Sequence, residues 1–141
     1  MHKKISRAEL IIFDLFGTIL VCYGTDHIIR PGTPEVLEKL KNKTLVVATD
    51  EPVISAKKVL GEYARRFARI YGKEHLIEEN RQRYKNLGQI CVDFSVGSNQ
   101  AVMISDDLNG SDSRSAEKYG VPFILVPRDS SSLVKVLDCR P

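Results

Sequence analysis

Short apolar runs of strand length alternate with amphipathic helical patterns along this chain of 141 residues. The runs are nearly continuous rather than alternating, which is typical of strands that are buried on both faces. They fall at residues 9–13, 44–48, 67–71, 101–105 and 122–126. Because parallel strands need a helix-length crossover between them, the alternation predicts an α/β fold, a doubly wound parallel sheet with helices on both faces.

Apolar residues at helical spacing predict the crossover helices. These helices are expected at residues 30–43, 52–66, 82–95, 111–119 and 131–137. In the first of them, Thr33 is expected as the N-cap and Pro34 at the first helical position, where the missing N–H costs nothing. No repeat or long linker interrupts the series, so residues 1–141 are expected to form a single domain.

The composition is that of an ordinary globular protein, with 43% hydrophobic and 28% charged residues. No apolar stretch approaches the roughly 18 residues of a membrane helix. The basic N-terminal segment reaches Asp14 before a signal-peptide core can form, so we expect a cytoplasmic protein without a membrane partner. The net charge is only +3, and the basic clusters at 64–69 and 81–85 are interpreted as solvated helix faces, so nucleic-acid binding is not favoured.

Acidic or hydroxyl side chains follow three of the predicted strands. Asp14 follows the first, Thr49 and Asp50 follow the second, and Asp106 and Asp107 follow the run at 101–105. Ligands bind outside the carboxyl ends of the strands in an open parallel sheet, and carboxylates gathered there repel one another unless a cation lies among them. An all-oxygen cluster suits Mg²⁺, although each Asp taken alone could simply cap the following turn or helix.

Four segments in order resemble the motifs of the haloacid dehalogenase-like (HAD) superfamily of hydrolases. They are "IIFDLFGTIL" (11–20), "RPGTPEVLEKLK" (30–41), "LVVATD" (45–50) and "AVMISDDLNGSDSRSAEKYGVPFILV" (101–126). Each segment lies on the predicted element that carries the corresponding motif in that superfamily. The resemblance spans residues 10 to about 128 and implies a Rossmann-like core.

The resemblance implies a role for each matched residue. Asp14 would be the nucleophile that takes a phosphoryl group, and its second oxygen would bind Mg²⁺ together with the backbone carbonyl of Phe16. Thr49 would donate a hydrogen bond to a phosphoryl oxygen, and Lys85 would balance the charge of the nucleophile and the phosphate. The implied phosphate-binding set is Phe16, Gly17, Thr49, Asp50 and Lys85.

Two of these assignments have alternatives in the sequence. Thr49 could act as the N-cap of the helix that follows it, and this role is compatible with phosphate binding. Arg81 and Arg83 are rivals of Lys85 from the same predicted turn, and an ordinary surface lysine is the plainer interpretation of Lys85.

The fourth motif is ambiguous by one residue. Counting from the strand makes Asp106 the metal ligand, whereas counting back from Ala116 and Gly120 makes it Asp107. We favour Asp106, because a loop absorbs an insertion more easily than a buried strand does. Asp112 would then be the second acid, which holds metal-bound water.

Phe16 stands where phosphatases of this superfamily usually carry a second Asp that protonates the leaving alcohol. Such general acid help is typically worth about 10²–10⁴ in rate. The segments between the motifs are also too short for either common cap domain, so the site is expected to be open. The resemblance therefore implies a weak Mg²⁺-dependent phosphohydrolase that acts on a large phosphorylated substrate or is covered by a second copy of the chain. The alternatives are a non-catalytic binding protein and a dehalogenase-type hydrolase.

Overall fold

The computed structural model describes residues 1–107, 110–129 and 131–135. Its centre is a five-stranded parallel sheet with the strand order β5-β4-β1-β8-β9. The strands are β1 (Leu10–Phe13), β4 (Thr44–Ala48), β5 (Arg69–Tyr71), β8 (Ala101–Ser105) and β9 (Phe123–Leu125). All five were predicted from the apolar runs, and the predicted parallel sheet is confirmed.

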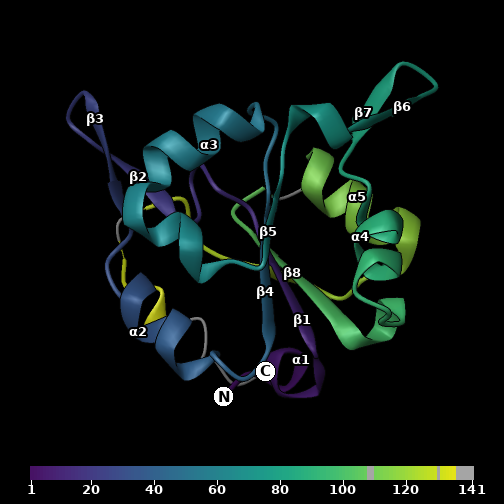
Figure 1. Ribbon diagram of the computed structural model, residues 1–141, viewed down its shortest axis with the longest axis horizontal. Helices are drawn as coiled ribbons and strands as arrows, with labels where there is room; N and C mark the ends of the chain where they lie inside the picture. The colour runs from purple at the N-terminus through teal and green to yellow at the C-terminus, as the bar shows by residue number, and fades with distance from the viewer. Residues whose placement is uncertain (108–109, 130, 136–141) are drawn as a thin grey trace.

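Helices cover both faces of the sheet (Figure 1). On one side lie α2 (Thr33–Lys39), α3 (Val53–Leu60) and the 3₁₀ helix η1 (Gly61–Arg66), and on the other lie α4 (Leu87–Asp93) and α5 (Ser111–Tyr119). Successive residues of β1 alternate between the two layers, so Ile11 and Phe13 join one core cluster while Leu10 and Ile12 join the other. The doubly wound architecture therefore has two apolar cores, one on each side of the sheet.

Two β-hairpins protrude at the same end of the sheet and were not predicted. The first consists of β2 (Leu20–Tyr23) and β3 (Asp26–Ile29), and the second of β6 (Ile77–Glu79) and β7 (Gln82–Tyr84). The remaining short elements are α1 (Lys3–Arg7), η2 (Lys73–His75) and η3 (Ser98–Gln100). In the described ranges the insertions after the strands are no larger than these hairpins, and no separate cap domain is present.

The helix expected at 82–95 is wrong in its first part. Residues 82–84 form β7, because Asn80 and Arg81 adopt positive φ values of 52° and 65° and turn the chain into a hairpin. Helix α4 begins only at Leu87, where the Asn86 side chain accepts a hydrogen bond from the Gln89 amide at 3.2 Å. Arg81 and Arg83 therefore lie in the hairpin and not at the start of α4.

Two other helix boundaries differ from expectation because of glycines with positive φ. Helix α3 ends at Leu60, since Gly61 has φ +56° and the chain continues as a 3₁₀ helix. Gly32, with φ +85°, is the N-cap of α2, which puts Thr33 inside the helix instead of at its cap. The helix expected at 131–137 extends beyond the described residues and stays a prediction.

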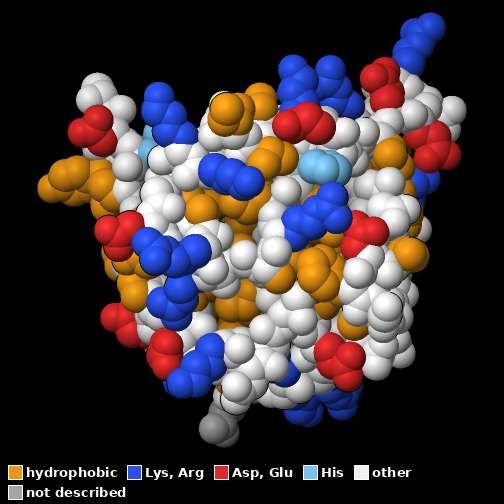
Figure 2. All heavy atoms as spheres, viewed as in Figure 1, with side chains coloured by type: hydrophobic (Ala, Val, Ile, Leu, Met, Phe, Trp, Pro, Cys, Tyr) orange, Lys and Arg blue, Asp and Glu red, His pale blue; other side chains and the backbone are white. Residues whose placement is uncertain are grey.

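The basic cluster at 64–69 lies at the surface among acidic side chains (Figure 2). Arg66 Nη2 lies 3.4 Å from a Glu38 carboxylate oxygen, and Arg69 Nη1 lies 3.3 Å from Asp93. Within the described residues, the longest apolar helix falls short of what is needed to cross a membrane.

The double burial of β1 makes a stability prediction. Ile12 is 0% exposed, whereas Ile54 on α3 is 78% exposed. Ile12→Ala should lower the free energy of unfolding by about 2–5 kcal/mol, because it leaves a cavity in the core. Ile54→Ala, the matched control, should change it by less than about 0.5 kcal/mol. Urea denaturation measures both, and similar losses would contradict the assigned core.

Candidate active site

The carboxyl ends of β4, β1 and β8 lie side by side at one end of the sheet, because β1 lies between β4 and β8 and the three strands are parallel. Phe13 is in register with Val47 on one side and with Ile104 on the other, so the segments after the three strands meet at the same level. A cavity of about 320 Å³ opens there. It is lined by Asp14, Phe16, Thr49, Asp50, Lys85, Asp106, Asp107 and Asp112, together with Glu51 and Arg128. The sequence-predicted site residues, Gly17 excepted, thus line one cavity.

Lys85 is buried between two carboxylates. Its Nζ lies 2.8 Å from Asp14 Oδ1 and 2.8 Å from Asp112 Oδ1, and its side chain is 3% exposed. The Lys85 amide donates to Ser115 Oγ on α5 at 3.0 Å, which fixes the backbone just before α4. Burial alone would lower the pKa of Lys85, but Asp14 and Asp112 outweigh it and raise the pKa, so the ammonium stays charged. Lys85 is therefore no ordinary surface lysine.

Asp14, which lines the cavity, is held by contacts to two other segments. Its backbone amide donates to the Ile104 carbonyl at 3.0 Å, and Thr18 Oγ1 lies 3.2 Å from Asp14 Oδ2. Burial raises the pKa of Asp14 to about 7; Lys85 opposes this rise, while Asp112 and Asp106 add to it. Ionising Asp14 among its acidic neighbours therefore costs free energy in the folded protein.

Asp106 faces the loop that follows Asp14. Its amide donates to Thr18 Oγ1 at 3.1 Å, and its Oδ1 lies 3.4 Å from the same hydroxyl, so one threonine links it to Asp14. A Cβ on Gly17, which has φ +87°, would lie 2.3 Å from Asp106 Oδ2. Asp106 Oδ2 also accepts a hydrogen bond from Arg128 Nε at 2.7 Å. The loop must therefore carry glycine at position 17 for Asp106 to approach it.

Asp107 takes a different direction. Its Oδ2 accepts a hydrogen bond from the Asp112 amide at 3.0 Å, so its carboxylate satisfies an amide in the first turn of α5. Ser105 Oγ donates to Asp112 Oδ2 at 2.7 Å and accepts from the Asp107 amide at 3.1 Å. Of the two candidate ligands, Asp106 thus shares a hydroxyl with Asp14, and Asp107 supports the start of a helix.

The predicted phosphate-binding residues differ in whether they still have a hydrogen-bond donor for a phosphate. Thr49 is buried and its Oγ1 accepts from the Glu51 amide at 3.2 Å, which leaves its hydroxyl proton for another acceptor. The Gly17 amide already donates to the Leu20 carbonyl at 2.7 Å, so the expectation that it binds phosphate is not supported. Asp50 is exposed at the cavity edge.

The donors around Asp14 fit Mg²⁺ in their chemistry. No group of three or more His, Cys, Asp or Glu side chains in the described part of the chain is arranged as a metal centre. Mg²⁺, however, is usually held by one or two carboxylates and completes its shell with water and substrate phosphate. Asp14 and Asp106, linked through Thr18, supply two such carboxylates.

Two arginines of this site were missed by the sequence analysis. Arg30 is 0% exposed; its Nε donates to the Ser131 carbonyl at 2.8 Å, and its Nη1 lies 3.4 Å from the Gly17 carbonyl. Nothing in the local pattern around Arg30 indicates such long-range contacts. Arg128 could have been predicted as a site residue, because it follows β9, the strand next to β8, at the same end of the sheet.

Neither a protein-family model nor a curated protein matches this sequence. Solved structures do match it. A haloacid dehalogenase-like family hydrolase from Streptococcus pneumoniae has a TM-score of 0.71 at 15% identity, with 94% of this chain and 91% of that chain covered. A HAD-superfamily hydrolase from Geobacter sulfurreducens has a TM-score of 0.67 at 17% identity, with 84% and 89% covered.

The chain has the haloacid dehalogenase-like fold. The similarity extends to the N-terminal part of a Bacteroides fragilis protein that contains a phosphatase domain complexed with Mg. That match has a TM-score of 0.70 at 19% identity and covers 93% of this chain but 39% of the other. In this chain, the carboxylates and Lys85 lie at the end of the sheet where the sequence motifs predicted them.

The raised pKa of Asp14 makes a prediction about stability. Between about pH 4 and pH 7 the folded protein binds a proton that the unfolded chain, with an ordinary pKa of 3.8, has released. The free energy of unfolding contributed by Asp14 therefore falls as the pH rises through this range, by roughly 1.4 kcal/mol for each unit by which the pKa is raised. Asp14→Asn should remove this fall and stabilise the metal-free protein at pH 8.

Urea denaturation in EDTA at pH 5 and pH 8 measures this difference. Asp26→Asn, which changes an exposed carboxylate on β3, is the matched control and should keep the wild-type pH dependence. An Asp14→Asn variant with the wild-type pH dependence would show that Asp14 is not the strained carboxylate.

Proposed function

We propose that this protein is a Mg²⁺-dependent phosphohydrolase that uses Asp14 as its nucleophile and is weak on alkyl phosphates. The observation that carries the proposal is the buried ammonium of Lys85, held at 2.8 Å between Asp14 and Asp112 at the carboxyl end of the sheet. The phosphatase domain from Bacteroides fragilis, complexed with Mg, supports the reaction class through its shared fold.

In this proposal the Asp14 carboxylate attacks the phosphorus atom, and the bond to the leaving oxygen breaks. Lys85 keeps Asp14 oriented through one carboxylate oxygen and neutralises charge that gathers as the dianionic phosphoryl group approaches. Water then attacks the phosphorus of the aspartyl-phosphate, which releases inorganic phosphate and restores Asp14.

The phosphoryl oxygens need donors that are fixed before the reaction. The Thr49 hydroxyl and the Lys85 ammonium, both on the cavity wall, would supply them. Asp14, Asp106 and the Phe16 carbonyl would hold Mg²⁺, which would add positive charge next to the phosphoryl group. Asp112, fixed by Lys85 and Ser105, completes the acidic wall.

The open site also supports two proposals about substrate and assembly. Among the described residues only hairpins flank the cavity, so it can admit a large phosphorylated substrate, or a second copy of the chain can cover it. We further propose a cytoplasmic location, in keeping with the composition of the sequence.

A non-catalytic protein that binds a phosphorylated ligand is the second candidate function, and it is favoured because position 16 carries Phe instead of an acidic residue. Dehalogenation is less favoured, because an uncapped site does not exclude water from a small apolar substrate.

Turnover of p-nitrophenyl phosphate with Mg²⁺ and with EDTA tests the proposal, since nitrophenolate leaves without a proton. We expect turnover that requires Mg²⁺ and that Asp14→Asn reduces to the level of the buffer blank, because an amide cannot attack phosphorus. Circular dichroism serves to check that the variant is folded. Full activity in Asp14→Asn would reject the nucleophile, and an inactive wild-type protein that still binds phosphate would favour the non-catalytic candidate.

Phe16→Asp tests why the activity should be weak. The new carboxyl group can protonate a poor leaving group, so turnover of glycerol phosphate should rise by about tenfold relative to that of p-nitrophenyl phosphate. Tenfold corresponds to about 1.4 kcal/mol of the barrier. Phe16→Asn, which has nearly the same shape but no acid, is the control. An equal change on both substrates would reject the missing-acid explanation.

A further inference from the structure

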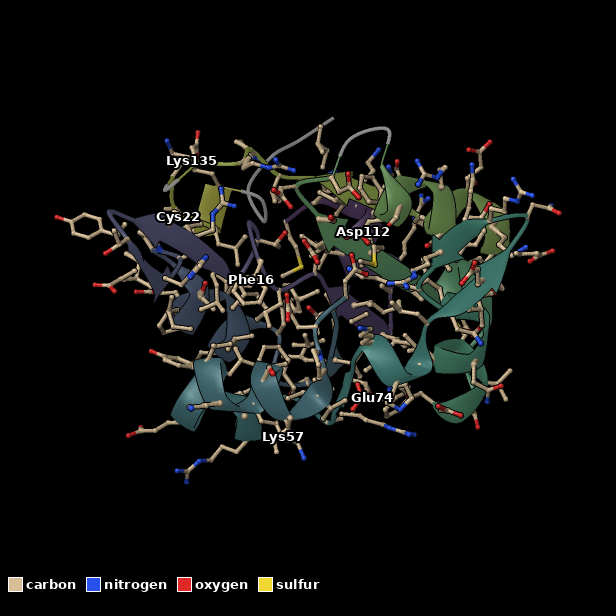
Figure 3. The ribbon with its side chains drawn as sticks, turned by 90° about the horizontal axis from the view of Figure 1, so that it is seen from above. Phe16, Cys22, Lys57, Glu74, Asp112 and Lys135 are labelled. Atoms are coloured by element: carbon tan, nitrogen blue, oxygen red, sulfur yellow. The ribbon has the colours of Figure 1, made fainter. Side chains whose placement is uncertain are left out.

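A second cavity lies beside the catalytic one, between the β2–β3 hairpin and the segment after β9. Its volume is about 630 Å³, and we call it the hairpin cleft. Among the residues that line it are Phe16, Val21, Cys22 and His27 and the charged residues Asp106, Arg128 and Asp129. Three of these, Phe16, Asp106 and Arg128, also line the catalytic cavity, so the two cavities share a wall. Figure 3 shows Phe16 between Cys22 of the hairpin and Asp112 of the catalytic site.

The hairpin side of the cleft is aromatic and apolar. The rings of Phe16 and His27 are 5.0 Å apart and nearly perpendicular, at 80°. His27 is paired across the hairpin with Cys22, whose Sγ lies 3.7 Å from His27 Nε2. The two rings thus already pack edge to face, and a further planar ring can stack or pack edge-on only against the ring surfaces that this contact leaves uncovered.

The opposite side of the cleft is charged but paired. Arg128 Nε and Asp106 Oδ2 are 2.7 Å apart, and the Asp106 side chain is only 4% exposed. The Arg128 side chain itself is 75% exposed, and Asp129 of the same wall lies 3.5 Å from Arg30 Nη2. Each of these charges has a partner within the protein, so this wall does not require a charged ligand. The cleft is therefore suited to an uncharged planar group attached to a phosphate in the neighbouring cavity.

The chemistry at Phe16 selects the same kind of group independently. With no proton donor at this position, the leaving oxygen must depart as an anion. A phenol with a pKa near 10 leaves far more readily in this way than an alcohol, whose pKa is close to the value of about 15.7 for water. With Phe at position 16, the site lacks the proton donor that the hydrolysis of an alkyl ester needs, and the Phe16 ring offers a surface on which an aryl ring packs.

We infer that the substrate is an aryl phosphate monoester, with its ring in the hairpin cleft and its phosphoryl group at Asp14. This inference rests on the proposed function and names its substrate class. The bond between Asp14 and phosphorus forms as the bond between phosphorus and the phenolic oxygen breaks. The electron pair leaves with the phenolate, which takes a proton from solvent water. Hydrolysis of the aspartyl-phosphate by a second water then restores Asp14.

The binding of two stable analogues tests the cleft apart from turnover. Phenylphosphonate and methylphosphonate carry the same phosphonate, but only the first has a ring. With Mg²⁺ present, calorimetry should show phenylphosphonate binding to the wild-type protein about tenfold more tightly. Both Phe16→Ala and His27→Ala should reduce this ratio to near one. Tyr23→Ala, a control on the same hairpin with a side chain that is 72% exposed and outside the cleft, should keep the ratio.

The outcomes separate this inference from the proposed function. Equal affinity for the two analogues in the wild-type protein, or an unchanged ratio in His27→Ala, would overturn the aryl cleft. If p-nitrophenyl phosphate turnover still depended on Asp14, the proposed function would survive that result. Absence of both analogue binding and Asp14-dependent turnover would reject both. His27 is exposed, so its variant should fold even if Phe16→Ala does not.

The ring can belong to a small molecule or to a tyrosine side chain. Turnover of free phosphotyrosine and of a phosphotyrosine peptide, each compared with the matching phosphoserine compound, distinguishes these sources. A preference for phosphotyrosine in either form supports the aryl class, and the form that reacts faster identifies the source. Equal rates for phosphotyrosine and phosphoserine in both forms would contradict it.

Discussion

The ammonium of Lys85 is the interaction on which the arrangement of this site depends. Six carboxylates line the cavity at one end of the sheet, and a buried carboxylate without a partner is strongly destabilising. Lys85 contacts one carboxylate from the segment after β1 and another from α5, and its own backbone amide is bound to Ser115. It therefore joins the central strand to both helices of one layer, and the position of Asp14 depends on that layer.

The central sheet and the acidic residues at the carboxyl ends of its strands could be predicted because each is indicated by a short stretch of sequence. A strand buried on both faces must be apolar throughout, as in Leu10–Phe13, and a polar residue directly after it must lie at the sheet edge. Lys85 was harder, since the helix expected to carry it begins two residues later, at Leu87. Its selection over Arg81 and Arg83 relied on the family resemblance together with its place at the start of the apolar stripe that follows it.

The elements that were missed are those whose signals are weak or distant. The two hairpins are built from short strands that are largely exposed, so they lack the apolar run by which the central strands were recognised. Arg30 and Arg128 act through partners about a hundred and about twenty residues away along the chain, and no local pattern encodes such contacts. The choice between Asp106 and Asp107 depended on loop geometry, which periodicity does not specify.

The buried guanidinium of Arg30 has a consequence for how the protein is made. It binds the Gly17 carbonyl of the loop after Asp14 and, through Ser131, a segment near the other end of the sequence. During synthesis the residues of β1 and of the loop after it are made early, but that loop lacks its brace until residue 131 has left the ribosome. Until then Arg30 must remain hydrated, because burying it without its partners would cost several kcal/mol. The loop that follows Asp14 is thus completed only after about a hundred further residues have been synthesised, so Asp14 is made long before the contacts that brace its loop.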